Sequence, residues 1–128
     1  MEAVIYLDTH VVEAAGQGNL RSLSKEARRL MDRAPEFRIS PIVLLELEYL
    51  REIGRIRVGA REVLSRLGAD IGLRVCELPF DEVALQATGE SWTRDVFDRV
   101  IVAQARLAKA ILITRDTAIQ AHYNKALG

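Results

Sequence analysis

The chain has 128 residues, of which 49% are hydrophobic and 28% charged, a composition typical of one soluble globular domain spanning residues 1–128. Its 18 basic and 18 acidic residues cancel, which excludes a strongly basic nucleic-acid coat protein and leaves any such binding to a local patch. The single cysteine, Cys76, excludes an internal disulfide and a cysteine-rich zinc site, and its apolar neighbours predict that it is buried.

The first 40 residues are predicted to hold two strands and two helices. Residues 3–7 form a continuous apolar run, which indicates a buried strand and is too short for a secretory signal or a membrane span. We therefore expect a cytoplasmic protein. Helices are predicted from about Thr9 and over about residues 20–33, with the breaker Gly16-Gln17-Gly18 between them, and a short strand over residues 38–40 follows.

The remaining elements continue this alternation. Ser40 as N-cap and Pro41 in the first helical position predict a helix that runs to about Glu52 and stops at Gly54. Further helices are predicted over about residues 60–67, 81–88 (capped by Asp81) and 94–109, strands over 73–78 and 110–114, and a last helical turn over 116–122. Strands separated by helices pair in parallel, so the predicted fold class is α/β: a three-layer α/β/α domain with a central parallel sheet of four to five strands.

Two carboxylates follow predicted strands. Asp8 comes directly after the first strand, and Asp116 follows the last clear strand by two residues. Binding sites in parallel sheets form at the carboxyl ends of the strands. Both side chains are therefore expected at the same edge of the sheet.

A third carboxylate, Glu46, interrupts an apolar stripe on the helix that begins at Pro41. At about 100° per residue, Glu46 falls near the middle of this stripe, which is predicted to face the core. The members of the stripe are Ile42, Leu45, Tyr49, Leu50 and Ile53. A buried carboxylate is costly unless a cation or an arginine compensates it, which favours a functional role. The alternative is that Glu46 lies at the open end of the stripe in solvent. Glu48 points to the other side of the helix.

The helix predicted from Arg94 adds two more acids. Asp98 precedes Ile101 by three residues and Ala105 by seven, which places it at the edge of the buried face. Asp95 lies one turn earlier and would face the same edge of the sheet. A stabilising interaction with the helix dipole, or an ion pair with Arg99, explains Asp95 equally well.

Asp8, Glu46, Asp98 and Asp116 thus come from four elements and can point at one place. Clustered carboxylates repel one another and need protons or a cation at neutral pH. Oxygen-only ligands suit hard cations such as Mg²⁺ or Mn²⁺. Such a site can activate water and neutralise a phosphodiester in its transition state.

These residues together resemble a known family. The segments Leu7-Asp8-Thr9-His10, Ser40-Pro41 with Glu46, residues 92–105 and Thr114-Arg115-Asp116 are similar to PIN domains, and more narrowly to the VapC toxins of toxin–antitoxin pairs. The resemblance covers almost the whole chain. Val96 departs from it, since proline is frequent there, and a final edge strand is expected to be short or missing.

The resemblance implies a Mg²⁺- or Mn²⁺-dependent endoribonuclease that forms a homodimer and is inhibited by a small VapB-type antitoxin. It implies that Asp8, Asp98 and Asp116 bind the metal and that Glu46 is a ligand, directly or through water. Asp95 matches a further acidic position, and Thr114 matches a hydroxyl position beside the site. For the antitoxin we expect a groove beside the helices from Leu20 and Pro41, with apolar residues available at Leu23, Leu30, Leu44 and Leu47.

Two aromatic positions near these motifs have competing interpretations. His10 could contact metal or RNA, but packing at the helix start is favoured because the other candidate ligands are all oxygens. Trp92 could stack on a base, but packing at the helix entry is favoured.

Other classes of protein are alternatives to a PIN-domain toxin. A receiver domain or a haloacid-type phosphatase fits poorly, since no lysine follows Thr114 until Lys125 and His10 stands where a phosphatase needs a second aspartate. A non-catalytic receiver-like α/β binding module would not need four acids. A housekeeping PIN nuclease that processes RNA without an antitoxin remains open on the sequence alone.

Overall fold

A computed structural model describes residues 4–128 of the chain. Its elements are β1 (Ile5–Leu7), α1 (Thr9–Gly16), α2 (Lys25–Arg33), β2 (Phe37–Ile39), α3 (Pro41–Glu52), α4 (Ala60–Ile71), β3 (Arg74–Val75), α5 (Phe80–Ala87), α6 (Val96–Ala108), β4 (Ile111–Ile113), α7 (Thr117–His122) and β5 (Ala126–Leu127). No helix among residues 4–128 is long and apolar enough to cross a membrane.

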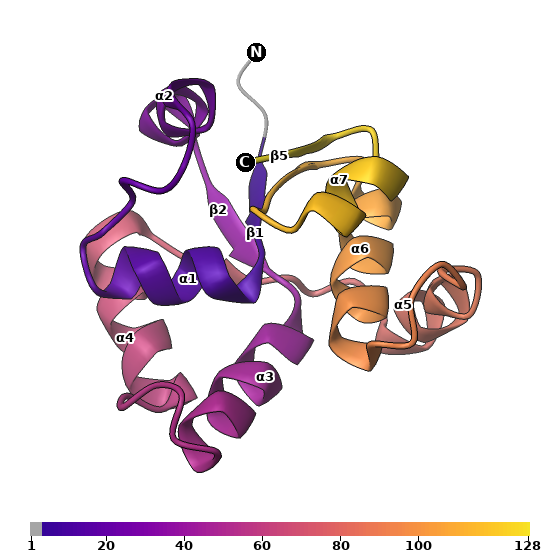
Figure 1. Ribbon diagram of the computed structural model, residues 1–128, viewed down its shortest axis with the longest axis horizontal. Helices are drawn as coiled ribbons and strands as arrows, with labels where there is room; N and C mark the ends of the chain where they lie inside the picture. Colours follow the sequence, from indigo (N-terminus) through magenta and orange to yellow (C-terminus); the bar gives the residue numbers. More distant parts are fainter. Residues whose placement is uncertain (1–3) are drawn as a thin grey trace.

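The five strands form one parallel sheet in the order β3-β2-β1-β4-β5. Figure 1 shows α1, α2 and α4 on one side of the central strands and α5 and α6 on the other. The predicted α/β class with a central parallel sheet is confirmed. The edge strand that was expected to be short or missing is present as the two-residue β5.

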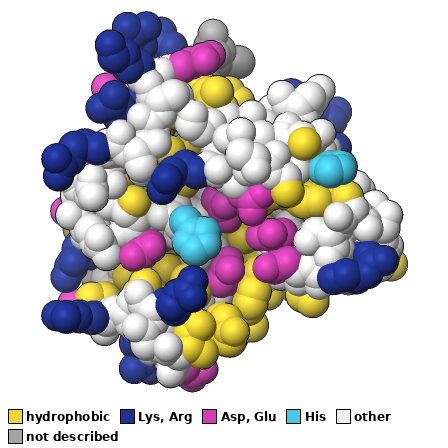
Figure 2. Space-filling view, viewed as in Figure 1, with side chains coloured by type: hydrophobic (Ala, Val, Ile, Leu, Met, Phe, Trp, Pro, Cys, Tyr) yellow, Lys and Arg dark blue, Asp and Glu magenta, His cyan; other side chains and the backbone are white. Residues whose placement is uncertain are grey.

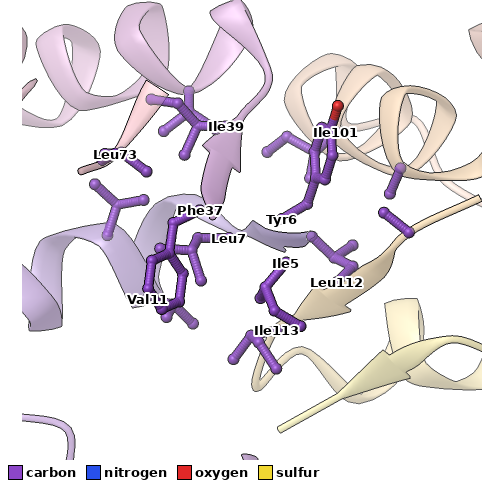
Figure 3. Close-up of a cluster of buried hydrophobic side chains, with 14 of the residues drawn as sticks. Ile5, Tyr6, Leu7, Val11, Phe37, Ile39, Leu73, Ile101, Leu112 and Ile113 are labelled. Atoms are coloured by element: carbon purple, nitrogen blue, oxygen red, sulfur yellow. The ribbon is translucent and has the colours of Figure 1, made fainter. Parts of the chain in front are cut away.

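The core forms where the apolar central strands meet the helices. All three residues of β1 are buried, and the side chains of β1, β2 and β4 pack with residues of α1 and α6 (Figure 3). Cys76 is buried, as predicted, and its Sγ accepts a hydrogen bond of 2.8 Å from the Tyr6 hydroxyl. This core fixes the carboxyl ends of β1 and β4, from which two of the predicted site residues project.

Several predicted boundaries need correction. The helix expected over residues 20–33 begins only at Lys25, because the Ser24 side chain caps it by accepting from the Ala27 amide. The helix expected to stop at Leu67 continues to Ile71 and ends at Gly72, whose left-handed φ of 69° favours glycine. Pro79, not Asp81, occupies the cap of α5. Residue 3 of the first predicted strand lies outside the described residues.

The face that α3 turns to the core also differs from the prediction. The buried residues are Val43, Leu47 and Leu50, whereas Leu45, Tyr49 and Ile53 are 59%, 46% and 50% exposed. The helix is apolar around most of its circumference, so its hydrophobic periodicity alone does not select one face. Consequently Glu46 lies beside an exposed apolar strip, not in the middle of a buried one.

Candidate active site

The carboxylate of Asp8 is the buried centre of the site. Because it directly follows β1, its side chain lies at the carboxyl edge of the sheet and is only 4% exposed. Its Oδ1 accepts from the Thr9 amide at 2.8 Å, and its Oδ2 accepts from the Thr114 hydroxyl at 2.6 Å. Burial raises the pKa of Asp8, and these two hydrogen bonds oppose that rise.

Thr114 connects Asp8 to Asp116. Its buried hydroxyl donates to Asp8 and accepts a hydrogen bond of 3.1 Å from the Asp116 amide. Asp116 is the N-cap of α7, and its Oδ1 accepts from the Ala118 and Ile119 amides at 2.8 and 3.1 Å. The hydroxyl and the cap thus fix both the backbone and the carboxylate of Asp116.

Glu46 reaches the same edge from α3. Its partly buried side chain accepts a hydrogen bond of 2.5 Å from the Thr9 hydroxyl. Burial raises the pKa of Glu46, the negative charges of Asp8 and Asp95 raise it further, and the Thr9 bond lowers it. Thr9 therefore serves two acids, since its amide binds one and its hydroxyl the other.

Asp98 shows the mutual repulsion of the acids most clearly. Burial raises the pKa of Asp98 from its ordinary value of 3.8 to about 7, together with the charges of Asp95, Asp8, Asp116 and Glu46. Asp95 is the exposed N-cap of α6 and accepts from the Asp98 amide at 3.1 Å. Five carboxylates from four segments of the chain therefore act on one another electrostatically.

These acidic side chains gather around a hollow near the middle of one face, with a histidine and basic side chains beside them (Figure 2). The structure brings together all the acids that the sequence singled out, including Asp95. As placed, however, no group of three or more His, Cys, Asp or Glu side chains within residues 4–128 converges closely enough to hold a cation.

The donor set nevertheless fits a hard divalent cation. Every candidate ligand is a carboxylate oxygen, which is the ligand type that Mg²⁺ and Mn²⁺ prefer. Burial and the charges of the neighbouring acids raise the pKa of Asp98, and a bound cation would offset both effects. Small side-chain rotations would have to close the site.

The neighbouring side chains give mixed outcomes. His10 is exposed and not packed at the helix start, and its charge lowers the pKa of Asp8 and Glu46. Trp92 packs against the core, as predicted. Thr9 was not predicted as a site residue, although its position directly after the strand-end Asp8 indicates a hydroxyl at this edge of the sheet. Glu48 points away and binds Arg51 and the Ala60 amide.

Solved structures with this fold span nearly the whole chain. A toxin–antitoxin complex from Klebsiella pneumoniae aligns with a TM-score of 0.65 and 18% identity, covering 97% of this chain and 96% of that one. VapBC2 from Rickettsia felis, bound to a DNA fragment from their promoter, gives a TM-score of 0.61, 18% identity, and coverage of 97% and 96%. PAE2754 from Pyrobaculum aerophilum aligns with a TM-score of 0.61 and 18% identity, covering 99% of this chain and 90% of that one.

No curated protein sequence matches the chain. The model of the PIN domain family, in contrast, matches residues 5–125, which include every carboxylate of the site. The chain therefore belongs to the PIN domain family, a family of nucleases.

Proposed function

We propose that this single PIN domain is a Mg²⁺- or Mn²⁺-dependent endoribonuclease of the cytoplasm and the toxin of a VapC-type toxin–antitoxin pair. The observation that carries the proposal is the gathering of five carboxylates at one edge of the sheet, where burial and the neighbouring charges raise the pKa of Asp98 to about 7. A cluster of like charges lowers the stability of the folded protein, a cost that is typical of functional sites. The structural similarity to toxin–antitoxin complexes supports the finer assignment.

In this proposal Asp8, Asp98 and Asp116 hold the cation, and Glu46 binds it directly or through a water. The cation would supply activation of a water and neutralisation of the charge that develops on the phosphate. The chain's own contribution is orientation. Hydrogen bonds from Thr9 and Thr114 hold the acids in place before any substrate arrives.

The test is cleavage of total RNA by the purified chain, with Mg²⁺, with Mn²⁺ and with excess chelator, followed by mapping of the cut ends. We expect cleavage only with metal, leaving 5′-phosphates and 3′-hydroxyls, because a carboxylate site activates water and not a ribose 2′-hydroxyl. Asp8→Asn is the inactive control. Cleavage that persists in chelator, or 2′,3′-cyclic phosphate ends, would refute the proposal.

The antitoxin is proposed to insert an arginine among Asp8, Asp98 and Asp116. A guanidinium binds carboxylates in a bidentate manner and would take the place of the cation. Its apolar segment needs a groove. Within residues 4–128, α2 and α3 lie at opposite ends of the molecule (Figure 1), so one groove beside both helices, as expected from the sequence, does not form. Of the leucines assigned to it, Leu23 and Leu47 are buried in the core.

A hollow between α3 and α4 is a better place for that segment. It has a volume of about 890 Å³, and its apolar floor is rimmed by charged residues. Leu44 and Leu64 supply the apolar contacts, while Arg57 and Arg61 would favour an acidic flank on the partner. We expect the product of the neighbouring small gene to bind here. Arg61→Glu, at an exposed position, should weaken that complex and leave cleavage by the free chain unchanged.

The exposed strip of α3 is the proposed dimer contact. Leu45, Tyr49 and Ile53 line it, and the Tyr49 ring lies 5.8 Å from that of Phe97 at the start of α6. A second copy packed here would bury this apolar surface next to the acidic site. Tyr49→Asp should convert a dimer to a monomer in sedimentation. If the lone chain cleaves RNA and the neighbouring gene product neither binds nor inhibits it, a housekeeping nuclease is the better assignment.

A further inference from the structure

Outside the acidic site, one buried acid is held by an organised cluster. Glu90 is 4% exposed, and both of its carboxylate oxygens are used. Arg106 Nε donates to Oε1 at 2.8 Å, while Arg106 Nη2 and Trp92 Nε1 reach Oε2 at 3.4 and 3.2 Å. The cluster joins the segment before α6 to the second half of α6 itself.

The same residues hold the end of α7. Arg106 Nη2 donates to the His122 carbonyl at 3.1 Å, and the Arg106 guanidinium lies 5.1 Å from the centre of the Tyr123 ring. The His122 imidazole stacks on the Trp92 indole, with ring centres 4.7 Å apart and planes inclined by only 6°. We call Glu90, Trp92, Arg106 and His122 the clamp.

The clamp acts on an element that carries a site residue. α7 has only six residues, and a helix this short has little stability of its own. Asp116 caps its first turn, so the direction of this carboxylate follows the orientation of the helix. The segment that supplies Glu90 and Trp92 continues directly into Asp95, the cap of α6.

We infer that the clamp positions Asp116 against the acids of α6, and that Glu90, Trp92, Arg106 and His122 are positioning residues of the site. A buried ion pair is a poor way to gain stability alone, since apolar side chains of similar size do as well or better. A guanidinium with several directional hydrogen bonds and two stacked rings do, however, fix the orientation of α7 relative to α6. The inference rests on the proposed function only in calling the acidic cluster a metal site.

The test begins with amide hydrogen exchange on the whole chain without metal. The Ala118 and Ile119 amides donate to Asp116, so their exchange reports directly whether that carboxylate stays in place. His122→Ala removes the stack at an exposed position. His122→Phe is the matched rescue, because it restores a flat ring but not the bond between His122 Nδ1 and the Ala118 carbonyl.

We expect His122→Ala to speed exchange at Ala118 and Ile119 about tenfold and His122→Phe to return it near the original rate. The amides of α4, on the far side of the sheet, should not change. Unchanged exchange at the two α7 amides, equal acceleration in α4, or failure of the phenylalanine to rescue would overturn the inference.

A second measurement separates this inference from the proposed function. Calorimetric titration with Mn²⁺ should show weaker binding in His122→Ala than in His122→Phe. If α7 loosens but Mn²⁺ affinity is the same in both, the clamp holds the helix without positioning Asp116, and the inference fails. If the unmodified chain binds no Mn²⁺, the proposed metal site fails, while the exchange data still decide whether the clamp fixes Asp116.

Discussion

Replacing Asp98 by asparagine should stabilise the metal-free protein. The pKa of Asp98 rises from 3.8 to about 7 on folding, which corresponds to about 4 kcal/mol at 1.36 kcal/mol per pKa unit. Solvent screening at this partly exposed side chain reduces the penalty to about 2 kcal/mol. For a domain of this size, Asp98→Asn should raise the melting temperature by about 7 °C at pH 8 in chelator.

The pH dependence of the melting temperature is a second test of the predicted stabilisation by Asp98→Asn. An acid whose pKa is raised on folding favours the folded state below its unfolded pKa, and this contribution is lost as pH rises through the folded value. The gain from Asp98→Asn should therefore shrink to less than half between pH 8 and pH 5. Asp98 is half-buried among four other acids, whereas Asp81 occupies the first turn of α5 in an exposed position.

Asp81→Asn is thus the matched control, since it removes the same favourable interaction with a helix dipole and should slightly lower the melting temperature. Calorimetry or circular dichroism of both variants would decide the matter. If Asp98→Asn melts no higher than Asp81→Asn at pH 8, the carboxylates do not repel one another as the structure indicates.

Variants at four further positions test single contacts. Glu46→Gln should abolish RNA cleavage. Glu48→Gln, which loses its ion pair with Arg51 but keeps an oxygen that can accept from the Ala60 amide, should lower the melting temperature slightly and leave cleavage unchanged; equal losses of activity would contradict this. Thr114→Val removes the hydroxyl that binds Asp8 and should reduce cleavage at least tenfold, with recovery in Thr114→Ser. Tyr123→Phe removes a hydroxyl that donates to two buried backbone carbonyls, and unfolding in urea should show a loss of about 1 kcal/mol with normal cleavage.

Local signals in the sequence predicted most of the fold. The Ser40-Pro41 pair marks the start of α3, and the apolar runs around Ile5 and Leu112 mark central strands. These signals act over a few residues, so they can be read from the chain directly. The start of α2 was placed too early because Leu20 and Leu23 fit a helical pattern, although they pack from a loop before the Ser24 cap.

The site could be predicted as a set of acids but not as a network. Asp8 and Asp116 follow strands, so sheet topology alone brings them to one edge. The contact of Thr9 with Glu46 spans 37 residues, and that of Thr114 with Asp8 spans 106. Such pairings depend on how the helices dock. The core-facing side of α3 was wrong for the same reason, because a helix apolar on two sides needs tertiary contacts to select one.

The hydrogen bonds divide the acids into two groups. The carboxylates of Asp8, Glu46 and Asp116 each accept from a hydroxyl or a backbone amide, and these bonds favour the charged form. Within residues 4–128 no donor lowers the pKa of Asp98, whose shift comes from burial and from neighbouring charges alone. Neighbouring charges raise the pKa of Asp8, Glu46 and Asp98 alike, but hydrogen bonds oppose the rise at Asp8 and Glu46. A cation that approaches from the hollow would meet three acids already oriented by hydrogen bonds, and would displace the proton of the fourth below about pH 7. We therefore expect the hydrogen-bond network to orient the site for a cation, and cation binding at Asp98 to weaken as pH falls through about 7.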